Sequence, residues 1–253
     1  MAFLKKEFKA IFKTYRFWVI PLVFVFFALM SAPTAKFTPE LLKSALPPGM
    51  AFKMPAPTLI DAFTQWFKNL SQIGVLAIIL LTMGIMAEEK ASGTILLVVT
   101  KPVSRANVIL SKFAAQISWL AASFIAAAAI CYLYSAALFK FASGSAFAWG
   151  NLLFLGYLIL IVAVTLFFST VLKNQIAAGG LSLIVVMGLS LVAALWPAFD
   201  KYGPTGLTTV GMNIAFGKSG AVVSQAAWPA LTAVAAIVLL MGAAIAIFNR
   251  QEL

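Results

Sequence analysis

Six long runs of apolar residues divide this chain, and they constrain its fold more than any other feature of the sequence. A helix needs about 18 apolar residues to cross the hydrocarbon core of a bilayer, where helices satisfy their own backbone hydrogen bonds. The first run is shorter, about 24 Å long as a helix, so this span has to borrow length from the residues before it. We therefore predict an all-α membrane protein with six transmembrane helices. The predicted spans cover residues 17–32, 70–87, 113–139, 149–172, 176–196 and 228–248.

The overall composition agrees with a single transmembrane domain over residues 1–253. Hydrophobic residues make up 63% of the chain and charged residues only 10%, too few to cover a soluble surface. The net charge of +11 would also suit a nucleic-acid-binding protein. However, the basic residues flank apolar runs, which is typical of a membrane surface, so we expect a lipid bilayer and no nucleic acid as partner. Cys131 lies within an apolar run and is interpreted as a small packing residue.

Residues 1–16 have the pattern of a basic amphipathic helix that lies on a membrane surface. Their apolar residues recur at helical spacing, and the basic residues occupy the positions between them. A cleaved signal peptide is the alternative, but no small-residue cleavage pattern follows the first apolar run. The apolar positions are Leu4, Phe8, Ile11 and Tyr15, and the basic ones are Lys5, Lys6, Lys9, Lys13 and Arg16.

Residues 33–69 are expected to form an external loop, because six prolines exclude one continuous helix. Short helices remain possible over 39–46 and over 58–70. In the second, Thr58 and Asp61 have capping-box spacing, and Trp66 would suit the membrane interface. An ordinary polar connection is the alternative.

Two further connections differ in length. Residues 173–175 make the fourth and fifth spans a tight hairpin. Residues 197–227 form a longer, glycine-rich segment that either dips back into the protein as a re-entrant element or forms a surface loop, and the sequence favours neither.

The distribution of Lys and Arg predicts that both termini are cytoplasmic. With that orientation the inner segments hold 11 Lys and Arg in 49 residues, and the outer segments hold 7 in 77. The positive-inside rule then places residues 88–112, which we call the hinge, in the cytoplasm of a multi-pass protein of the cell membrane.

In the hinge a run of charges and a glycine is followed by a short apolar segment, then by Lys-Pro and a second polar start. Gly93 can adopt backbone angles that other residues avoid, Pro102 stops the helix before it, and Ser104 is a plausible N-cap for the next helix. The pattern therefore predicts a helix, then a break with a defined fold, and then a second helix.

Several kinds of chemistry find no residues in this sequence. The chain has no histidine, no nucleotide-binding Gly-Lys-Ser/Thr loop and no metal-ligand cluster, and none of the predicted spans contains Asp, Glu, Lys or Arg. We therefore expect a non-catalytic protein with no catalytic or metal-binding residues and no cofactor of its own. If it drives uphill transport, the energy has to come from another chain.

The hinge sequence Glu88-Glu89-Lys90, Gly93-Thr94, Leu96-Leu97 and Lys101-Pro102-Val103-Ser104-Arg105, with the tail Phe248 to Leu253, resembles the permease subunit of a type-2 ABC exporter. The likeness covers the whole chain. Ala91-Ser92 before the glycine and Val98-Val99 after it depart from the usual pattern without breaking it.

The resemblance implies a permease that pairs with a second copy or a homologous permease. Two copies of a separate ABC ATPase subunit, which bind ATP and Mg, would dock on the hinge. The residues implied in this coupling are Glu88, Glu89, Lys90, Gly93, Thr94, Ile95, Leu96, Val99, Lys101, Pro102, Ser104 and Arg105. Ile95, Leu96 and Val99 would supply apolar contacts and the charged residues the rim. The substrate remains open.

Two other classes stay open at this point. An ion-coupled secondary transporter could bind sodium through backbone carbonyls, with Gly179-Gly180 as a helix break. A non-transporting membrane scaffold is the third class.

Overall fold

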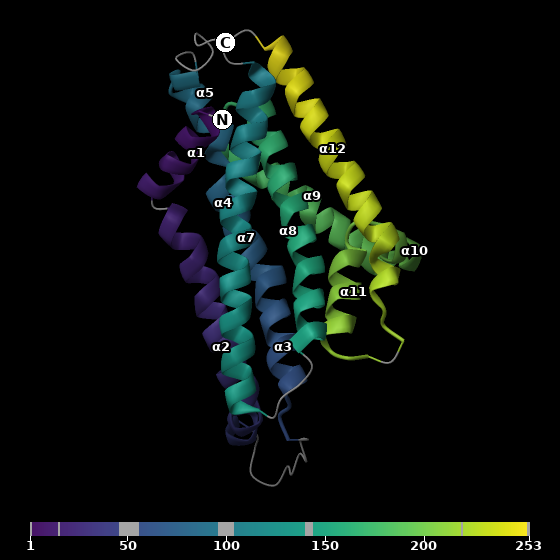
Figure 1. The fold of residues 1–253 in the computed structure, drawn as a ribbon. Coiled ribbons are helices and arrows are strands. Elements are labelled where there is room, and N and C mark those ends of the chain that lie inside the picture. The colour runs from purple at the N-terminus through teal and green to yellow at the C-terminus, as the bar shows by residue number, and fades with distance from the viewer. Residues whose placement is uncertain are drawn as a thin grey trace.

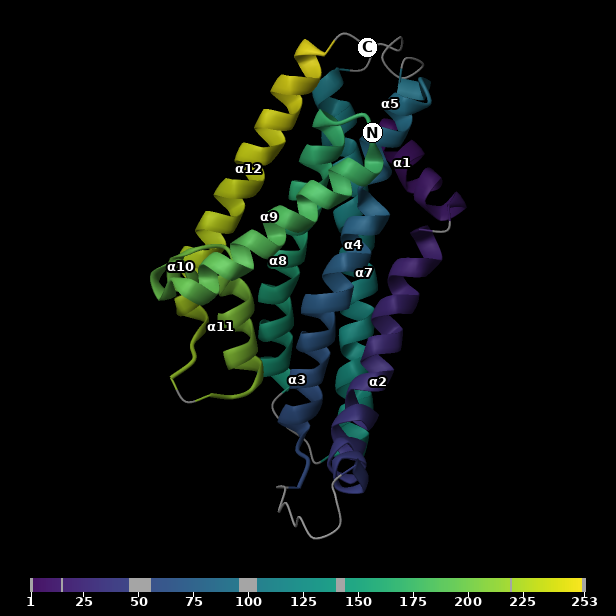
Figure 2. The same ribbon diagram turned by 180° about the vertical axis from the view of Figure 1, so that it is seen from behind.

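The computed structural model describes residues 2–14, 16–45, 56–95, 104–139, 144–218 and 220–251. Within these ranges the chain is helical and contains no strand. Figure 1 shows the helices as a bundle, and Figure 2 shows it from behind. The elements are α1 (Ala2–Lys13), α2 (Arg16–Ala45), α3 (Leu59–Asn69), the π-helix η1 (Leu70–Gly74), α4 (Val75–Thr82), α5 (Gly84–Ala91), α7 (Arg105–Leu138), α8 (Gly144–Val171), α9 (Gln175–Leu195), α10 (Pro197–Tyr202), α11 (Gly206–Ala215), the 3-10 helix η2 (Val223–Ala226) and α12 (Ala227–Arg250).

Six helical stretches in the described ranges are long and apolar enough to cross a membrane, which confirms the predicted fold class. They are Phe17–Glu40, Leu59–Ala91, Arg105–Leu138, Gly144–Val171, Gln175–Leu195 and Val223–Arg250. The predicted N-terminal helix is also present as α1, which packs against α7.

The first span is longer than predicted, because α2 continues through prolines that were expected to end it. Pro21, Pro33 and Pro39 all lie inside this helix. A proline removes one backbone hydrogen bond, but neighbouring helices can hold a membrane helix in shape around it. Here α2 packs along α7 and α3. The short helix expected over 58–70 is present as α3, but the bounds of the external loop predicted over 33–69 are wrong, since the candidate spans Phe17–Glu40 and Leu59–Ala91 extend into it from both sides.

The second span begins with the helix that the sequence suggested for the membrane interface. Its predicted start is correct in detail: Thr58 donates to Asp61 Oδ2 from its backbone N–H at 2.7 Å and from its hydroxyl at 2.8 Å. The predicted location is wrong, because Trp66 is fully buried in the protein and donates from Nε1 to Asn151 Oδ1 on α8 at 2.9 Å. A tryptophan whose N–H has an internal partner has no need of the interface.

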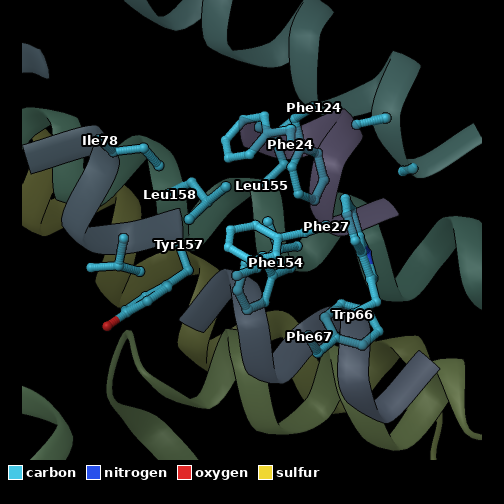
Figure 3. Packing of buried hydrophobic residues seen from close by; sticks show 14 of the residues in the cluster. Phe24, Phe27, Trp66, Phe67, Ile78, Phe124, Phe154, Leu155, Tyr157 and Leu158 are labelled. Carbon is cyan, nitrogen blue, oxygen red and sulfur yellow. The ribbon is translucent and has the colours of Figure 1, made fainter. Parts of the chain in front are cut away.

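An aromatic core joins α2, α3, α7 and α8 (Figure 3). Phe154 of α8 packs against Phe67 and Phe124, with ring centroids 5.4 Å and 6.2 Å away. Phe24 of α2 meets Phe124 edge-on at 5.8 Å. In contrast, α9 and α12 expose most of their apolar side chains, as expected of helices that face lipid or another subunit.

The segment after α9 folds back beside α8 instead of forming a surface loop. A Cβ on Gly150 would lie 2.5 Å from the Gly211 carbonyl oxygen, and one on Gly211 would lie 2.8 Å from the Gly150 carbonyl oxygen. Nearer the middle of α8, Gly156 lies against Leu207. These contacts follow α8 inward from its start. Of the two arrangements that the sequence allowed, α11 therefore has the re-entrant one (Figures 1 and 2).

Candidate functional site

The described parts of the hinge, residues 88–95 and 104–112, lie at the end of the molecule where α1, α5, the start of α7 and the end of α12 gather (Figure 1). After α5 the backbone turns at Gly93, which has φ of +69°. The Ser92 N–H donates to the Glu88 carbonyl at 3.0 Å and the Gly93 N–H to the Lys90 carbonyl at 3.3 Å. The predicted conformational role of Gly93 is thus confirmed.

The helix after the hinge also begins where the sequence indicated. The hydroxyl of Ser104 accepts a hydrogen bond from the Asn107 N–H at 3.3 Å, which is an N-cap contact. Leu96, Val99, Lys101 and Pro102 lie outside the described residues, so their predicted roles stay predictions.

A buried lysine links three elements beneath the hinge. The Nζ atom of Lys112 on α7 lies 2.6 Å from Glu89 Oε1 on α5 and 3.3 Å from Glu7 Oε2 on α1. The Lys112 side chain is only 3% exposed. Buried charges are costly unless they are paired, and removing one partner of such a pair is strongly destabilising. We call these three residues the ion-pair cluster.

The ion-pair cluster forms part of the wall of a cavity of about 300 Å³ between α1, α5 and α7. Two carboxylates share the buried cation of Lys112 there. Glu7 Oε1 and Glu89 Oε2 are buried without a hydrogen-bond partner, although Lys6 Nζ lies 3.8 Å from Glu7 Oε1. The amide nitrogen of Gln116 on the same wall is also buried without one.

Two basic hinge residues bind the C-terminal ends of other helices in the same chain. Arg105 Nη1 donates to the carbonyls of Phe248, Asn249 and Gln251, at 2.7, 3.2 and 3.0 Å. Lys90 donates to the carbonyl of Thr170 near the end of α8. Cations at these positions satisfy unpaired carbonyls and complement the helix dipole.

These contacts correct part of the predicted partner surface. Arg105 was expected at an exposed rim, but it is half-buried and joins α7 to α12. Ile95 was expected to contact a partner, but it is 2% exposed and packs in one cluster with Met86, Ile109 and Phe248. Glu89 faces Lys112 inside the protein. Among the predicted residues that the structure describes, Glu88, Thr94 and Ser104 remain exposed.

The second span breaks just before α5, and a serine from α8 fills the break. Ser169 Oγ accepts from the N–H groups of Met86 and Ala87, both at 3.0 Å, and donates to the Met83 carbonyl at 2.7 Å. The side chain of Met83 fits over Gly179 of α9, where a Cβ would lie 2.6 Å from its sulfur. As a result, α5 is a separate short helix between the span and the hinge.

Sequence reasoning missed Glu7, Lys112 and Ser169. The first two had a signal, because Glu7 is a single carboxylate among the basic residues of α1 and Lys112 is a single cation at the start of an apolar run. Ser169 had none, since a serine inside an apolar helix commonly bonds to its own backbone.

Known proteins resemble this chain over most of its length. A protein of Bacillus subtilis (strain 168), described as "Uncharacterized transmembrane protein YxlG", is 28% identical over 206 residues, which cover 81% of this chain and 80% of that protein. Its description agrees with the membrane-spanning fold. Residues 44–253 match the family described as "Protein of unknown function (DUF2705)", and the chain belongs to that family.

Proposed function

We propose that this chain is the permease subunit of an ATP-driven type-2 ABC exporter, in which a separate ATPase subunit docks on the hinge. The observation that carries the proposal is the ion-pair cluster, through which Glu89 and Lys112 at the two ends of the hinge are joined to each other and to Glu7 of α1. The resemblance of the hinge sequence to that family also supports the proposal.

The contacts give the hinge a mechanical connection to the membrane helices. Force applied near Gly93 acts on α5, and Lys112 passes it to α7 and α1 through two ion pairs. Separating such buried pairs costs several kcal/mol, so the three elements should move together. Ser169 bonds to both sides of the break, so motion of α5 should reach α8 as well.

The surface offered to an ATPase consists of Glu88, Thr94 and Ser104 together with the hinge residues that the structure does not describe. In the proposed orientation this end faces the cytoplasm of a cell-membrane protein, where ATP is available. Two permeases would pair through their exposed apolar helices, and two ATPase subunits would supply ATP and Mg. The permease itself would carry out no chemistry.

Co-purification tests the proposal. The tagged full chain is extracted in mild detergent from the membranes of its own organism, and bound proteins are identified by mass spectrometry. We expect an ABC ATPase in stoichiometric amount, ATP hydrolysis by the complex and none by the permease alone. Hydrolysis by the isolated chain, or a purified chain that is active in transport without any ATPase, would overturn the proposal.

A further inference from the structure

A second cavity, far from the ion-pair cluster, lies between α7 and α8 near the opposite end of the bundle and has a volume of about 280 Å³. Its wall on each helix is a single stripe with helical spacing. On α7 the stripe runs from Phe124 to Tyr132, and on α8 it runs from Gly144, the first residue of the helix, to Leu155.

The shape of this cavity matches one acyl chain. From Gly144 to Leu155 a helix rises about 17 Å, roughly half of a 30 Å hydrocarbon core. The cavity therefore extends from the start of α8 over a length that one acyl chain in a single leaflet could fill. Ile125 and Leu152 on its walls are 59% and 54% exposed, so it opens on the outer face of the bundle.

The walls are mainly apolar and favour an apolar occupant, with Tyr132 and Asn151 as the polar lining residues. Asn151 is the buried amide among the lining residues, and both polar atoms of its side chain make hydrogen bonds within the protein. Its Oδ1 accepts from Trp66 Nε1 at 2.9 Å, and its Nδ2 donates to the Phe147 carbonyl at 2.8 Å. Water enters a cavity of this size only when several polar groups can bind it, whereas an empty apolar cavity loses packing energy.

We propose that this cavity is a binding site for one acyl chain of a membrane phospholipid. The surrounding medium proposed here is lipid hydrocarbon, and the walls offer it mainly apolar contacts, with Tyr132 and Asn151 as the polar lining residues. The bound lipid would fill the space between α7 and α8 next to the aromatic core (Figure 3). This site is independent of the proposed function and of the hinge.

The buried Trp66 provides a local probe. It is fully shielded by the protein, but it bonds to Asn151 on the cavity wall and stacks on Phe124 with centroids 6.0 Å apart. The full chain is prepared with Trp66 as its single tryptophan, the others being replaced by Phe. It is reconstituted in vesicles of phosphatidylcholine with or without dibrominated acyl chains, which quench tryptophan on close contact.

We expect brominated lipid to quench most of the Trp66 fluorescence. Ala129→Phe, which places a ring in the cavity, should abolish most of that quenching. Ala126→Phe is the matched control, because Ala126 is exposed on the same helix and does not line the cavity. Trp66 fluorescence that is insensitive to brominated lipid, or equal quenching in the two variants, would overturn the proposal.

A second measurement applies if the single-tryptophan chain fails to fold. In the background with all natural tryptophans, phospholipid retained after a detergent wash is quantified by mass spectrometry. Ala129→Phe should retain less lipid per chain than Ala126→Phe, and equal retention would contradict the site.

Discussion

At the residue scale, the behaviour of each charged group depends on what the fold places next to it. Lys112 borders an apolar run in the sequence, yet it is the cation that two carboxylates share. Arg105 has the sequence context of an exposed rim residue, yet three carbonyls of the C-terminal segment surround it. Local sequence indicates such residues but does not name their partners, because Glu7 and Phe248 are more than a hundred positions away.

Replacing Lys112 by methionine should strongly destabilise the protein. The buried carboxylate of Glu7 and the partly buried one of Glu89 would lose their shared cation, and breaking a buried pair costs about 3–5 kcal/mol. Thermal unfolding of the detergent-solubilised chain measures the effect. Lys36→Met, at an exposed position of α2, is the control and should change the midpoint little. Adding Glu7→Gln and Glu89→Gln to Lys112→Met should recover much of the loss. An unchanged midpoint in Lys112→Met alone would contradict the buried pairing.

Gly93→Ala tests the turn without introducing a clash, since no atom lies within 4 Å of the added Cβ. The backbone at φ of +69° disfavours an L-residue by about 1–2 kcal/mol, so the hinge should become less stable. This strain makes local opening of the turn easier. The backbone amides at positions 92 and 93 should therefore exchange hydrogen about 5- to 30-fold faster. Gly180→Ala, also in open space but in a helix, should show no such change. Equal exchange in both variants would mean that the turn relaxes to another conformation.

At the element scale, the apolar runs identified every membrane-spanning helix, but the ends of these helices depended on tertiary contacts. Prolines at 33 and 39 are strong local signals for a helix end, yet packing of α2 along α7 and α3 overrides them. The interfacial pattern of residues 58–70 belongs to a buried face of the second span. The path of α11 was undecided in the sequence because its contacts, Gly150 with Gly211, join residues distant along the chain.

Gly211→Leu should detach α11 from α8. The added side chain would meet the Gly150 backbone, which cannot move aside without separating the helices. Overpacking of this kind typically costs about 1–3 kcal/mol, and here the obstacle is backbone. Thermal unfolding and protease resistance of residues 197–227 report the change. Gly242→Leu is the control, because that glycine has open space around it. If both variants unfold alike, the close approach of α8 and α11 is incorrect.

At the scale of the whole molecule, residues 2–13, the hinge and the end of α12 gather at one end of the bundle (Figure 1). The density of Lys and Arg predicts that this end is cytoplasmic, and coupling to an ATPase requires it.

Impermeant thiol labelling of intact cells tests this orientation. Cys131 is first replaced, and single cysteines are introduced at Lys53, between α2 and α3, and at Thr94 in the hinge. The Lys53 position should react and the Thr94 position should not, until the membrane is permeabilised. The reverse labelling pattern would mean that the orientation is opposite to the predicted one and that a cytoplasmic partner cannot reach the hinge.

The most direct test of the account is site-specific photo-crosslinking from the hinge in living cells. A photoreactive amino acid replaces the exposed Thr94, and a second chain carries it at the exposed Gln225, between α11 and α12. The account predicts that Thr94 captures an ABC ATPase subunit, identified by mass spectrometry, and that Gln225 does not. Capture of no ATPase at Thr94 by a chain that still supports transport, or equal capture at both positions, would contradict the coupling role of the hinge.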